Sequence, residues 1–165
     1  MQQRGFTLIE MLVVLVIIGI LSTAVALSIS PSPRRLLDAE AVRLASLLES
    51  ANAEALAGQR RLAWTMHEHD NGYDFLLADD ALTTTPRWLP VGMDDRFRSR
   101  RLDDEVRISH VEVDGQALAA GELLIFRRGD PPLFRIILSA GKDRTVATST
   151  VLGLPSGRVT VTDGK

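Results

Sequence analysis

The pattern of hydrophobic and polar positions changes twice along this chain. Residues 11–29 carry no charge, and twelve of these nineteen residues are Leu, Ile or Val. Between Leu37 and Ala55, small and apolar residues recur with the period of one helix face. After Gly58, apolar residues alternate with polar ones, which is typical of strands. The order of these patterns predicts an apolar helix, an amphipathic helix and a β-rich domain.

The apolar stretch is long enough to cross a membrane. Nineteen residues, at about 1.5 Å each, approach the roughly 30 Å of a hydrocarbon core. Its Leu, Ile and Val residues favour insertion by about 4 to 7 kcal/mol, whereas one carboxylate costs at most about 3.5 kcal/mol. Glu10, at the edge of the stretch, therefore does not prevent insertion. A charge is costly at that position, so it suggests a function.

Two prolines, Pro31 and Pro33, separate the apolar stretch from the amphipathic one. Proline lacks an amide donor and clashes with the preceding turn, so a kink or break is predicted here. Ser32 before Pro33 is typical of a helix start, because serine caps free amides and proline suits the first turn. We predict a second helix from Pro33 to about Gly58, since glycine favours a helix end.

The second helix has a stripe of small and apolar residues on one side. Two heptads of Leu and Ala are too few for a coiled coil, so packing on the β domain is the better interpretation. The opposite face, with Arg43, Glu49 and Asn52, is expected to be left for water or neighbouring molecules. The stripe consists of Leu37, Ala41, Leu44, Leu48, Ala51 and Ala55.

The remaining chain predicts an antiparallel β-sheet. Asp70-Asn71-Gly72 is a strong turn signal between two alternating segments, so a hairpin is predicted there. The alternation changes phase near Ser109–His110, which indicates a β-bulge. No connection is long enough for a helical crossover, so neighbouring strands are expected to be antiparallel. Further strands are predicted at 123–127, 133–139, 145–151 and 158–162, whereas 83–102 is expected to be irregular apart from a short edge strand at 87–91.

The N-terminus carries a processing signature. An ordinary secretory signal has its small-residue cleavage site after the apolar core. Here the small residue at a plausible boundary, Gly5, lies before the apolar run. This N-terminus resembles the type IV prepilin signature, which has a short basic leader, a glycine, a new N-terminal residue and a glutamate four residues further on. The matching residues are Arg4, Gly5, Phe6 and Glu10.

This resemblance implies processing by a prepilin peptidase in the membrane. The peptidase would cut between Gly5 and Phe6 on the cytoplasmic side, and the new amine of Phe6 would be methylated. Glycine suits the cut because it has no side chain to obstruct a close backbone approach. The expected partner of Glu10 in this family is the N-terminal amine of a neighbouring subunit, which would set the register of a filament. The alternative is that Glu10 lies at the headgroup level of a simple anchor without a role.

The C-terminal half adds a second resemblance. The order of its elements resembles that of the H-type minor pseudopilins of type II secretion. These elements are a strand ending in Phe126, a Gly/Pro turn, the strand Phe134–Leu138, a Thr/Val-rich strand and a closing Gly157-Arg158-Val159. The implied fold class is α+β and pilin-like, with a kinked N-terminal helix and an antiparallel sheet. The implied divisions are a leader at 1–5, a membrane and assembly helix at 6–30, a periplasmic helix at 31–58 and a globular domain at 59–165.

Charge and composition narrow the functional classes. A net charge of -2 and a pI near 5.9 argue against a dedicated nucleic-acid binder. The absence of cysteine excludes disulfides and thiolate chemistry. Phe97 could stack on a nucleobase within the basic run, but flanking acidic residues cancel much of its field, so ion pairing or a partner contact is the better interpretation. The basic run contains Arg96, Arg98, Arg100 and Arg101.

Other candidate sites are less specific. His67-Glu68-His69-Asp70 places two histidines on one strand face at a spacing that a metal could use, although an exposed hairpin end is the ordinary explanation. Gly141-Lys142 lacks the hydroxyl residue and first glycine of a phosphate loop, and no nucleophile elbow is present. We therefore predict no enzyme activity, cofactor or metal. Three acidic doublets could assemble a calcium site, but solvated loop charges are the simpler interpretation. The doublets are Asp79-Asp80, Asp94-Asp95 and Asp103-Asp104.

The leading hypothesis is a minor pseudopilin subunit of a type II secretion pseudopilus, serving protein export across the outer membrane. It implies a single-pass protein of the bacterial inner membrane with its C-terminal domain in the periplasm. The implied partners are the prepilin peptidase, the major and other minor pseudopilins, and the inner-membrane secretion platform. Two alternatives remain open: a minor pilin of a type IV pilus, such as one for DNA uptake, and a membrane-anchored periplasmic binding domain or enzyme.

Overall fold

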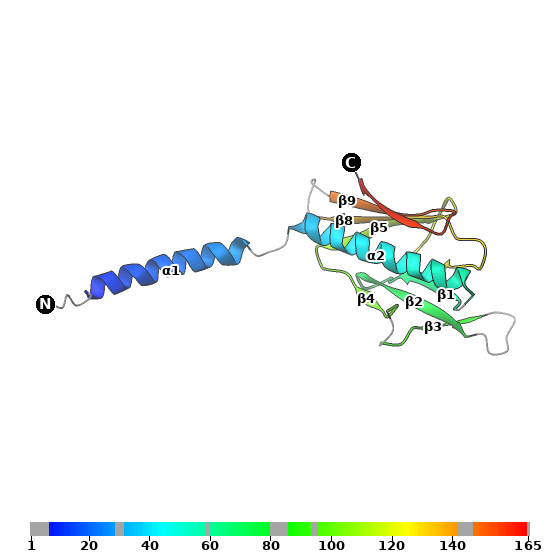
Figure 1. Ribbon diagram of the computed structural model, residues 1–165, viewed down its shortest axis with the longest axis horizontal. Coiled ribbons are helices and arrows are strands. Elements are labelled where there is room, and N and C mark those ends of the chain that lie inside the picture. The colour runs from blue at the N-terminus through cyan, green and yellow to red at the C-terminus, as the bar shows by residue number, and fades with distance from the viewer. Residues whose placement is uncertain are drawn as a thin grey trace. The chain divides into compact units, whose positions relative to one another are not determined.

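The computed structural model describes residues 7–28, 32–58, 60–79, 86–93, 96–141 and 147–164. The chain forms two compact units that divide between Ser32 and Pro33. Within the described ranges, the first unit contains helix α1 (Leu8–Ser28), and the second contains helix α2 (Pro33–Leu56) and ten strands (Figure 1). Helix α2 begins at Pro33 as predicted, whereas residues 29–31, where the kink or break was predicted, lie outside the described residues.

Helix α1 carries apolar side chains on all sides. Every side chain described in this unit, from Thr7 to Thr23, is exposed. A helix that is apolar all round is normally covered by protein or lipid. Among the residues that the structure describes, no helix is both long enough and apolar enough to cross a membrane. The membrane span at 6–30 therefore stays a prediction.

Helix α2 places its predicted stripe in the core of the second unit. All six stripe residues, from Leu37 to Ala55, are at most 3% exposed. They pack with residues of both sheets, while Arg43 and Glu49 on the opposite face are exposed as expected. The prediction that Asn52 faces water is wrong. Asn52 is fully buried, because the turn before the last strand covers this part of the helix and receives a hydrogen bond from it.

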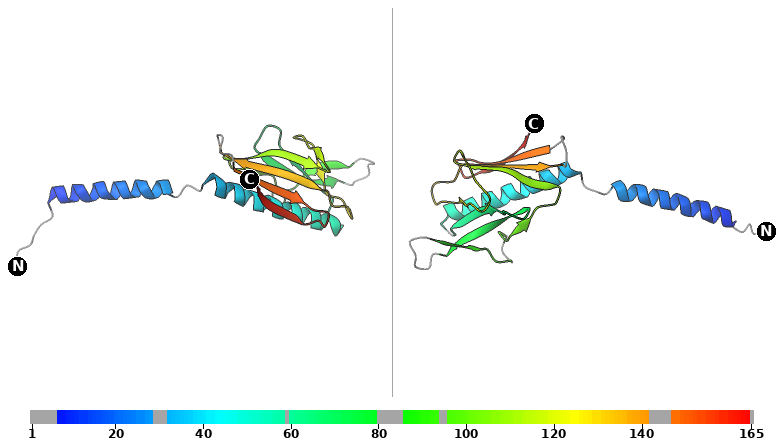
Figure 2. Two further views of the ribbon diagram at one scale, coloured as in Figure 1. Left: turned by 90° about the horizontal axis from the view of Figure 1, so that it is seen from above. Right: turned by 180° about the vertical axis from the view of Figure 1, so that it is seen from behind.

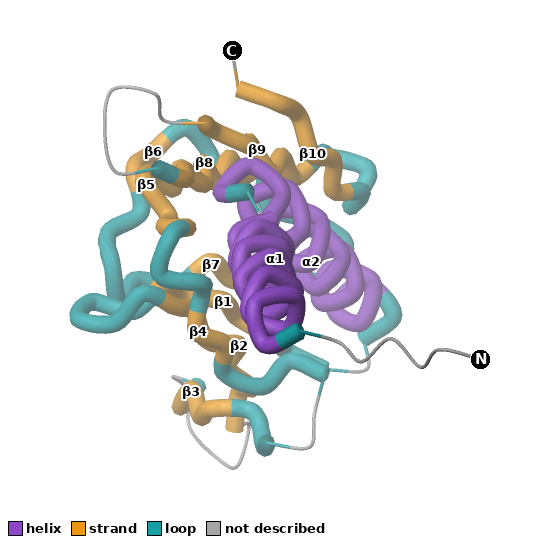
Figure 3. The backbone as a smooth tube through the Cα atoms, turned by 90° about the vertical axis from the view of Figure 1, so that its left-hand side faces the viewer, coloured by secondary structure: helices purple, strands orange, loops and turns teal. Residues whose placement is uncertain are grey.

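The strands form two antiparallel sheets, whereas the sequence predicted one. The first sheet has the order β3-β2-β1-β7, with β4 also pairing with β2, and the second has the order β10-β9-β8-β5-β6. Figure 3 shows the sheets as two separate groups of strands beside α2. Helix α2 packs mainly on β8, β9 and β10 of the second sheet (Figure 2). The strands are β1 (Leu62–Met66), β2 (Gly72–Asp79), β3 (Arg87–Pro90), β4 (Arg100–Arg101), β5 (Val106–Val113), β6 (Gln116–Ala117), β7 (Leu124–Ile125), β8 (Phe134–Ala140), β9 (Ala147–Gly153) and β10 (Val159–Gly164).

Several local predictions are confirmed within these sheets. Strands β1 and β2 form the hairpin predicted around Asn71, with Met66 opposite Tyr73. The pairing of β5 with β8 shifts register between Ile108 and His110, at the predicted bulge. The edge strand predicted at 87–91 is β3. Strand β7 is shorter than the predicted 123–127, and the two-residue strands β4 and β6 were not predicted, because segments this short leave no alternation to detect.

Candidate functional site

The predicted processing and assembly residues belong to the first unit. Gly5 and Phe6 lie outside the described residues. Glu10 lies in the first turn of α1 and is the single charged residue of this helix. Its side chain is exposed, and within residues 7–28 its carboxylate forms no ion pair or hydrogen bond. The site is therefore a lone carboxylate at the N-terminal end of an apolar helix.

Thr7 caps the helix at this point. Its Oγ1 accepts a hydrogen bond from the N–H of Glu10 at 3.3 Å. Its carbonyl accepts from the N–H groups of Glu10 and Met11, at 3.1 and 3.3 Å. Threonine at the cap and glutamate three residues later have the spacing of a capping box, and the carboxylate suits the positive end of the helix dipole. This role of Thr7 was not predicted, although the Thr-x-x-Glu spacing is a sequence signal for it.

The surroundings of Glu10 decide what its carboxylate can do. The large apolar side chains between Leu8 and Leu21 are each between 45% and 85% exposed. An apolar cover of lipid or of other helices would bury these side chains and remove water from the carboxylate. A buried carboxylate is strongly unfavourable unless a cation accompanies it. The arrangement therefore favours a cationic partner supplied from outside the helix.

Phe97 does not have the role suggested for it in the basic run. Its side chain is fully buried, and its ring centroid lies 5.1 Å from that of Phe75. The pairing of β4 with β2 brings this segment onto the first sheet, which places Phe97 in the aromatic core. The expectation that Phe97 offers a stacking face to a nucleobase is therefore wrong.

The four arginines of the basic run have different environments. Arg96 forms an ion pair with Glu54 of α2, and its guanidinium lies 4.9 Å from the ring centroid of Phe97. Arg100 is half-buried in β4 and donates a hydrogen bond to the carbonyl of Arg96 at 3.2 Å. Arg98 and Arg101 are exposed. The run is thus partly a structural element, since Arg96 and Arg100 stabilise the fold.

Tyr73 is a buried polar group beside this segment. Its side chain is fully buried, and its hydroxyl has no hydrogen-bond partner in the part of the chain that is described. Burial raises the pKa of Tyr73 above its ordinary value, whereas the charges of Arg100 and Arg43 act in the opposite direction. The ring centroid of Tyr73 lies 6.1 Å from those of Trp64 and Phe75, so we interpret this group as part of the core.

Among the described residues, the histidines do not come together with the members of the acidic doublets in a group of three. His67 and His69 follow the end of β1, so the expectation that they share a strand face is wrong. His67 Nε2 lies 3.1 Å from Asp74 Oδ1, while the side chain of His69 is 89% exposed. Across the described ranges, no three His, Asp or Glu side chains are grouped to hold a metal ion. Parts of the doublets lie outside the described residues, namely Asp80, Asp94 and Asp95.

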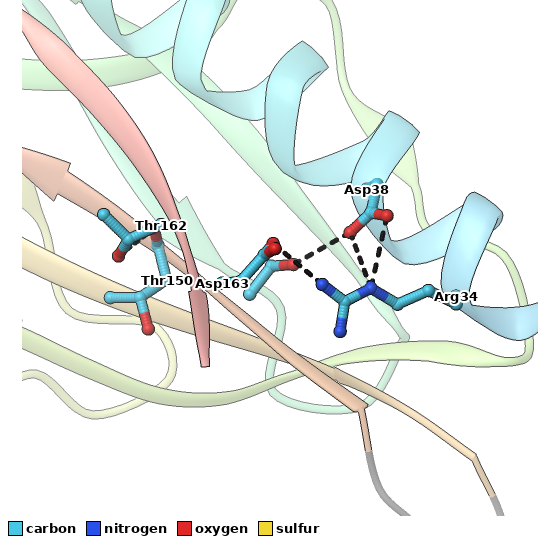
Figure 4. Close-up of polar contacts among 6 residues, drawn as sticks. Arg34, Asp38, Thr150, Thr162 and Asp163 are labelled. Atoms are coloured by element: carbon cyan, nitrogen blue, oxygen red, sulfur yellow. Dashed lines mark hydrogen bonds and ion pairs between the residues drawn. The ribbon is translucent and has the colours of Figure 1, made fainter. Parts of the chain in front are cut away.

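A polar network ties the start of α2 to the last two strands (Figure 4). The Arg34 guanidinium lies 2.8 Å from Asp163 of β10 and 3.2 Å from Asp38, one helical turn further on. Asp38 also accepts a hydrogen bond from the hydroxyl of Ser149 in β9 at 3.2 Å. Ser149 and Asp38 are 111 residues apart, so local sequence patterns do not reveal the network. It fixes the C-terminal strand to the end of α2 where the second unit begins.

Comparisons with known proteins identify the family. A family model described as the prokaryotic N-terminal methylation motif matches residues 1–26. Type II secretion system protein H of Pseudomonas aeruginosa is 38% identical over 144 residues, which cover 84% of this chain and 77% of that protein. The chain belongs to the type II secretion system protein H family. The predicted resemblance to the H-type branch is therefore confirmed.

A solved structure supports the same fold. The minor pseudopilin EpsH from the type II secretion system of Vibrio cholerae matches with a TM-score of 0.57 and 14% sequence identity. The match covers 77% of this chain and 96% of that chain. At this identity the likeness concerns the fold, and it confirms the α+β, pilin-like class with antiparallel sheets. The roles assigned to Gly5, Phe6 and Glu10 stay predictions.

Proposed function

We propose that this chain is a minor pseudopilin, a structural subunit of a type II secretion pseudopilus that serves protein export across the outer membrane. The observation that carries the proposal is an apolar helix whose single charge is Glu10, joined to a domain of the protein H family. A catalytic protein would need a constellation of reactive groups, whereas a filament subunit needs surfaces and a register. The features of this chain are those of a filament subunit.

The proposal assigns residues 1–5 to a leader that a prepilin peptidase removes. The cut between Gly5 and Phe6 leaves the apolar helix on the mature protein, and methylation follows at the new amine of Phe6. Before assembly, residues 6–30 would hold the protein in the inner membrane, with the domain at 59–165 in the periplasm. The exposed apolar side chains of α1 support this proposal, because they need a cover that the helix does not provide itself.

Assembly would exchange lipid contacts for contacts with neighbouring helices. Tightly packed apolar side chains replace lipid contacts through dispersion forces, so the exchange need not be costly. Glu10 would then lie between helices, where its charge requires a partner. The amine of Phe6 on a neighbouring subunit is such a cation. This pairing would fix the axial register relative to the major pseudopilin and other minor pseudopilins, after extraction from the inner membrane. The inner-membrane secretion platform would be a further partner.

Mass analysis of the N-terminus, on protein extracted from the membrane, tests the proposal. We expect a chain that begins at Phe6 with a methylated amine. A Gly5→Leu variant should remain as the full-length precursor, because a bulky residue obstructs the close approach of the peptidase. Gly19→Leu, inside the apolar helix, is the matched control and should be processed normally. A functional native protein that begins at Met1, or after residue 29, would contradict the proposal.

A further inference from the structure

A groove of about 400 Å³ lies in the second unit, at the C-terminal end of α2. It is formed by the helix end, the segment that precedes β1 and the segment that follows β7. Four of its eight lining residues are arginines, and none is acidic. The lining residues are Ala55, Gly58, Arg60, Arg61, Ile125, Phe126, Arg127 and Arg128. We call this feature the arginine groove.

Arg60 and Arg61 interact with other groups of the protein, whereas Arg127 and Arg128 are exposed. Glu54 forms an ion pair with Arg96 outside the groove and lies 3.7 Å from Arg60. Asp130 lies 4.0 Å from Arg127, and the two side chains are 81% and 60% exposed. A pair this long and this exposed is weak, because water screens it. Arg127 and Arg128 therefore leave positive charge in the arginine groove, on a chain whose net charge is -2.

Stabilisation of the helix end explains only part of the arrangement. Gly58 has a φ of +68°, and a Cβ at this position would lie 3.1 Å from the guanidinium carbon of Arg128. Arg128 therefore lies close to the end of α2, where a cation offsets the negative end of the helix dipole. Arg127 is not explained in this way, since its side chain is mostly exposed. Two adjacent arginines after β7 thus extend the positive charge beyond the helix end.

We propose that the arginine groove binds an acidic segment of a partner protein, an extended stretch with at least two Asp or Glu side chains. Guanidinium groups bind carboxylates through two parallel hydrogen bonds, which makes arginine suited to such a ligand. The partly buried Ile125 and the arginine stems add apolar contact area for the ligand backbone. A recess lined by arginines and apolar residues suits a chain segment, whereas a membrane surface is flat. The inference adds a contact surface to the proposed function and does not depend on processing at Gly5.

Binding of an acidic peptide to the full-length chain in nonionic detergent tests this inference. The probe is a fluorescein-labelled octapeptide of alternating Glu and Ser, followed by fluorescence anisotropy. The double variant Arg127→Gln/Arg128→Gln should weaken binding about tenfold or more, because it removes two charge-assisted contacts. The matched control is Arg98→Gln/Arg101→Gln, which removes the same charge from exposed positions of the same unit. We expect the control to weaken binding less than about twofold.

Each outcome of these measurements supports or contradicts binding of an acidic peptide at the arginine groove. Equal weakening in both double variants would mean general charge attraction, and an absence of saturable binding would also overturn the inference. Vesicles containing phosphatidylglycerol provide a second probe, for which the full-length chain is held in phosphatidylcholine nanodiscs instead of detergent. Vesicle binding that depends on the groove arginines, without peptide binding, would indicate a membrane contact instead. If the double variant fails to fold, Arg127→Gln alone replaces it, since this side chain is 60% exposed and should still weaken peptide binding.

Discussion

The side-chain amide of Asn52 donates a hydrogen bond to the carbonyl oxygen of Gly157 over 3.1 Å. Both residues are buried, and they are 105 positions apart in the chain. Asn52 belongs to α2, and Gly157 lies in the turn between β9 and β10 with a φ of +81°. The bond therefore holds the connection of the last two strands on the helix.

Replacement of Asn52 by alanine should destabilise the second unit. The carbonyl of Gly157 would stay buried without its donor, which costs about 1 to 3 kcal/mol. Unfolding of the full chain by guanidinium chloride, followed by tryptophan fluorescence, measures this loss. Glu49→Ala, on the exposed face of the same helix, should change the free energy of unfolding by less than about 0.5 kcal/mol. Equal effects of the two substitutions would contradict the role of Asn52.

Phe97→Ala should destabilise the protein by about 3 to 5 kcal/mol, because it leaves a cavity in the aromatic core. The same unfolding measurement applies. Met93→Ala is the control: its side chain is 80% exposed, and a change within about 0.5 kcal/mol is expected. A Phe97→Ala variant as stable as the parent would mean that this ring is not a core residue.

Much of the fold could be predicted because a helix or strand buries one face, and that face appears as a periodic pattern of apolar residues in the local sequence. The stripe of α2 repeats with the helical period, and the bulge at Ser109 appears as a change of phase between Ile108 and Val111. Alternation reports which residues are buried but not which strands pair. The division into two sheets therefore depends on contacts that no local pattern contains.

The candidate functional residues were likewise predictable only where the signal lies in the local sequence. Glu10 stands out because its charge interrupts an apolar run. Phe97 was misjudged because its neighbours are arginines and aspartates, while the contact that buries it, with Phe75, lies in another strand. The arginine groove joins residues near 60 to residues near 127. It exists only once β1 and β7 pair.

Tyr73 should make stability depend on pH at alkaline values. In the unfolded chain a tyrosine ionises near its ordinary pKa of 10.0, whereas burial raises the pKa of Tyr73 in the folded protein. From about pH 10 upward the unfolded state binds fewer protons, so the Tyr73 contribution to the free energy of unfolding falls until the raised pKa is reached. Tyr73→Phe should remove this part of the decline. At neutral pH it should leave stability unchanged or raise it, since the buried hydroxyl has no hydrogen-bond partner in the described structure.

The ionisation of Tyr73 can be measured directly. It is the single tyrosine of the chain, so tyrosinate absorbance reports on this residue alone. The native protein should titrate above 10.0, and the protein unfolded in denaturant should titrate near that value. A native titration at or below the unfolded one would show that burial does not control this group.

Glu10→Gln separates processing from assembly. The amide keeps the shape of the side chain but removes its charge, so a cut after Gly5 and methylation of Phe6 should still occur. Without the charge, the helix loses the proposed attraction to a neighbouring amine, and its register in the assembly is no longer specified.

The chain contains no cysteine, so Val16→Cys in α1 gives a unique crosslinking position. Crosslinks to partner pseudopilins should form with Glu10 present and disappear in Glu10→Gln. Glu49→Gln, which removes one carboxylate from the exposed face of α2, should leave them intact. Normal crosslinking of processed Glu10→Gln would refute the assembly role, and accumulation of its precursor would assign Glu10 to processing instead.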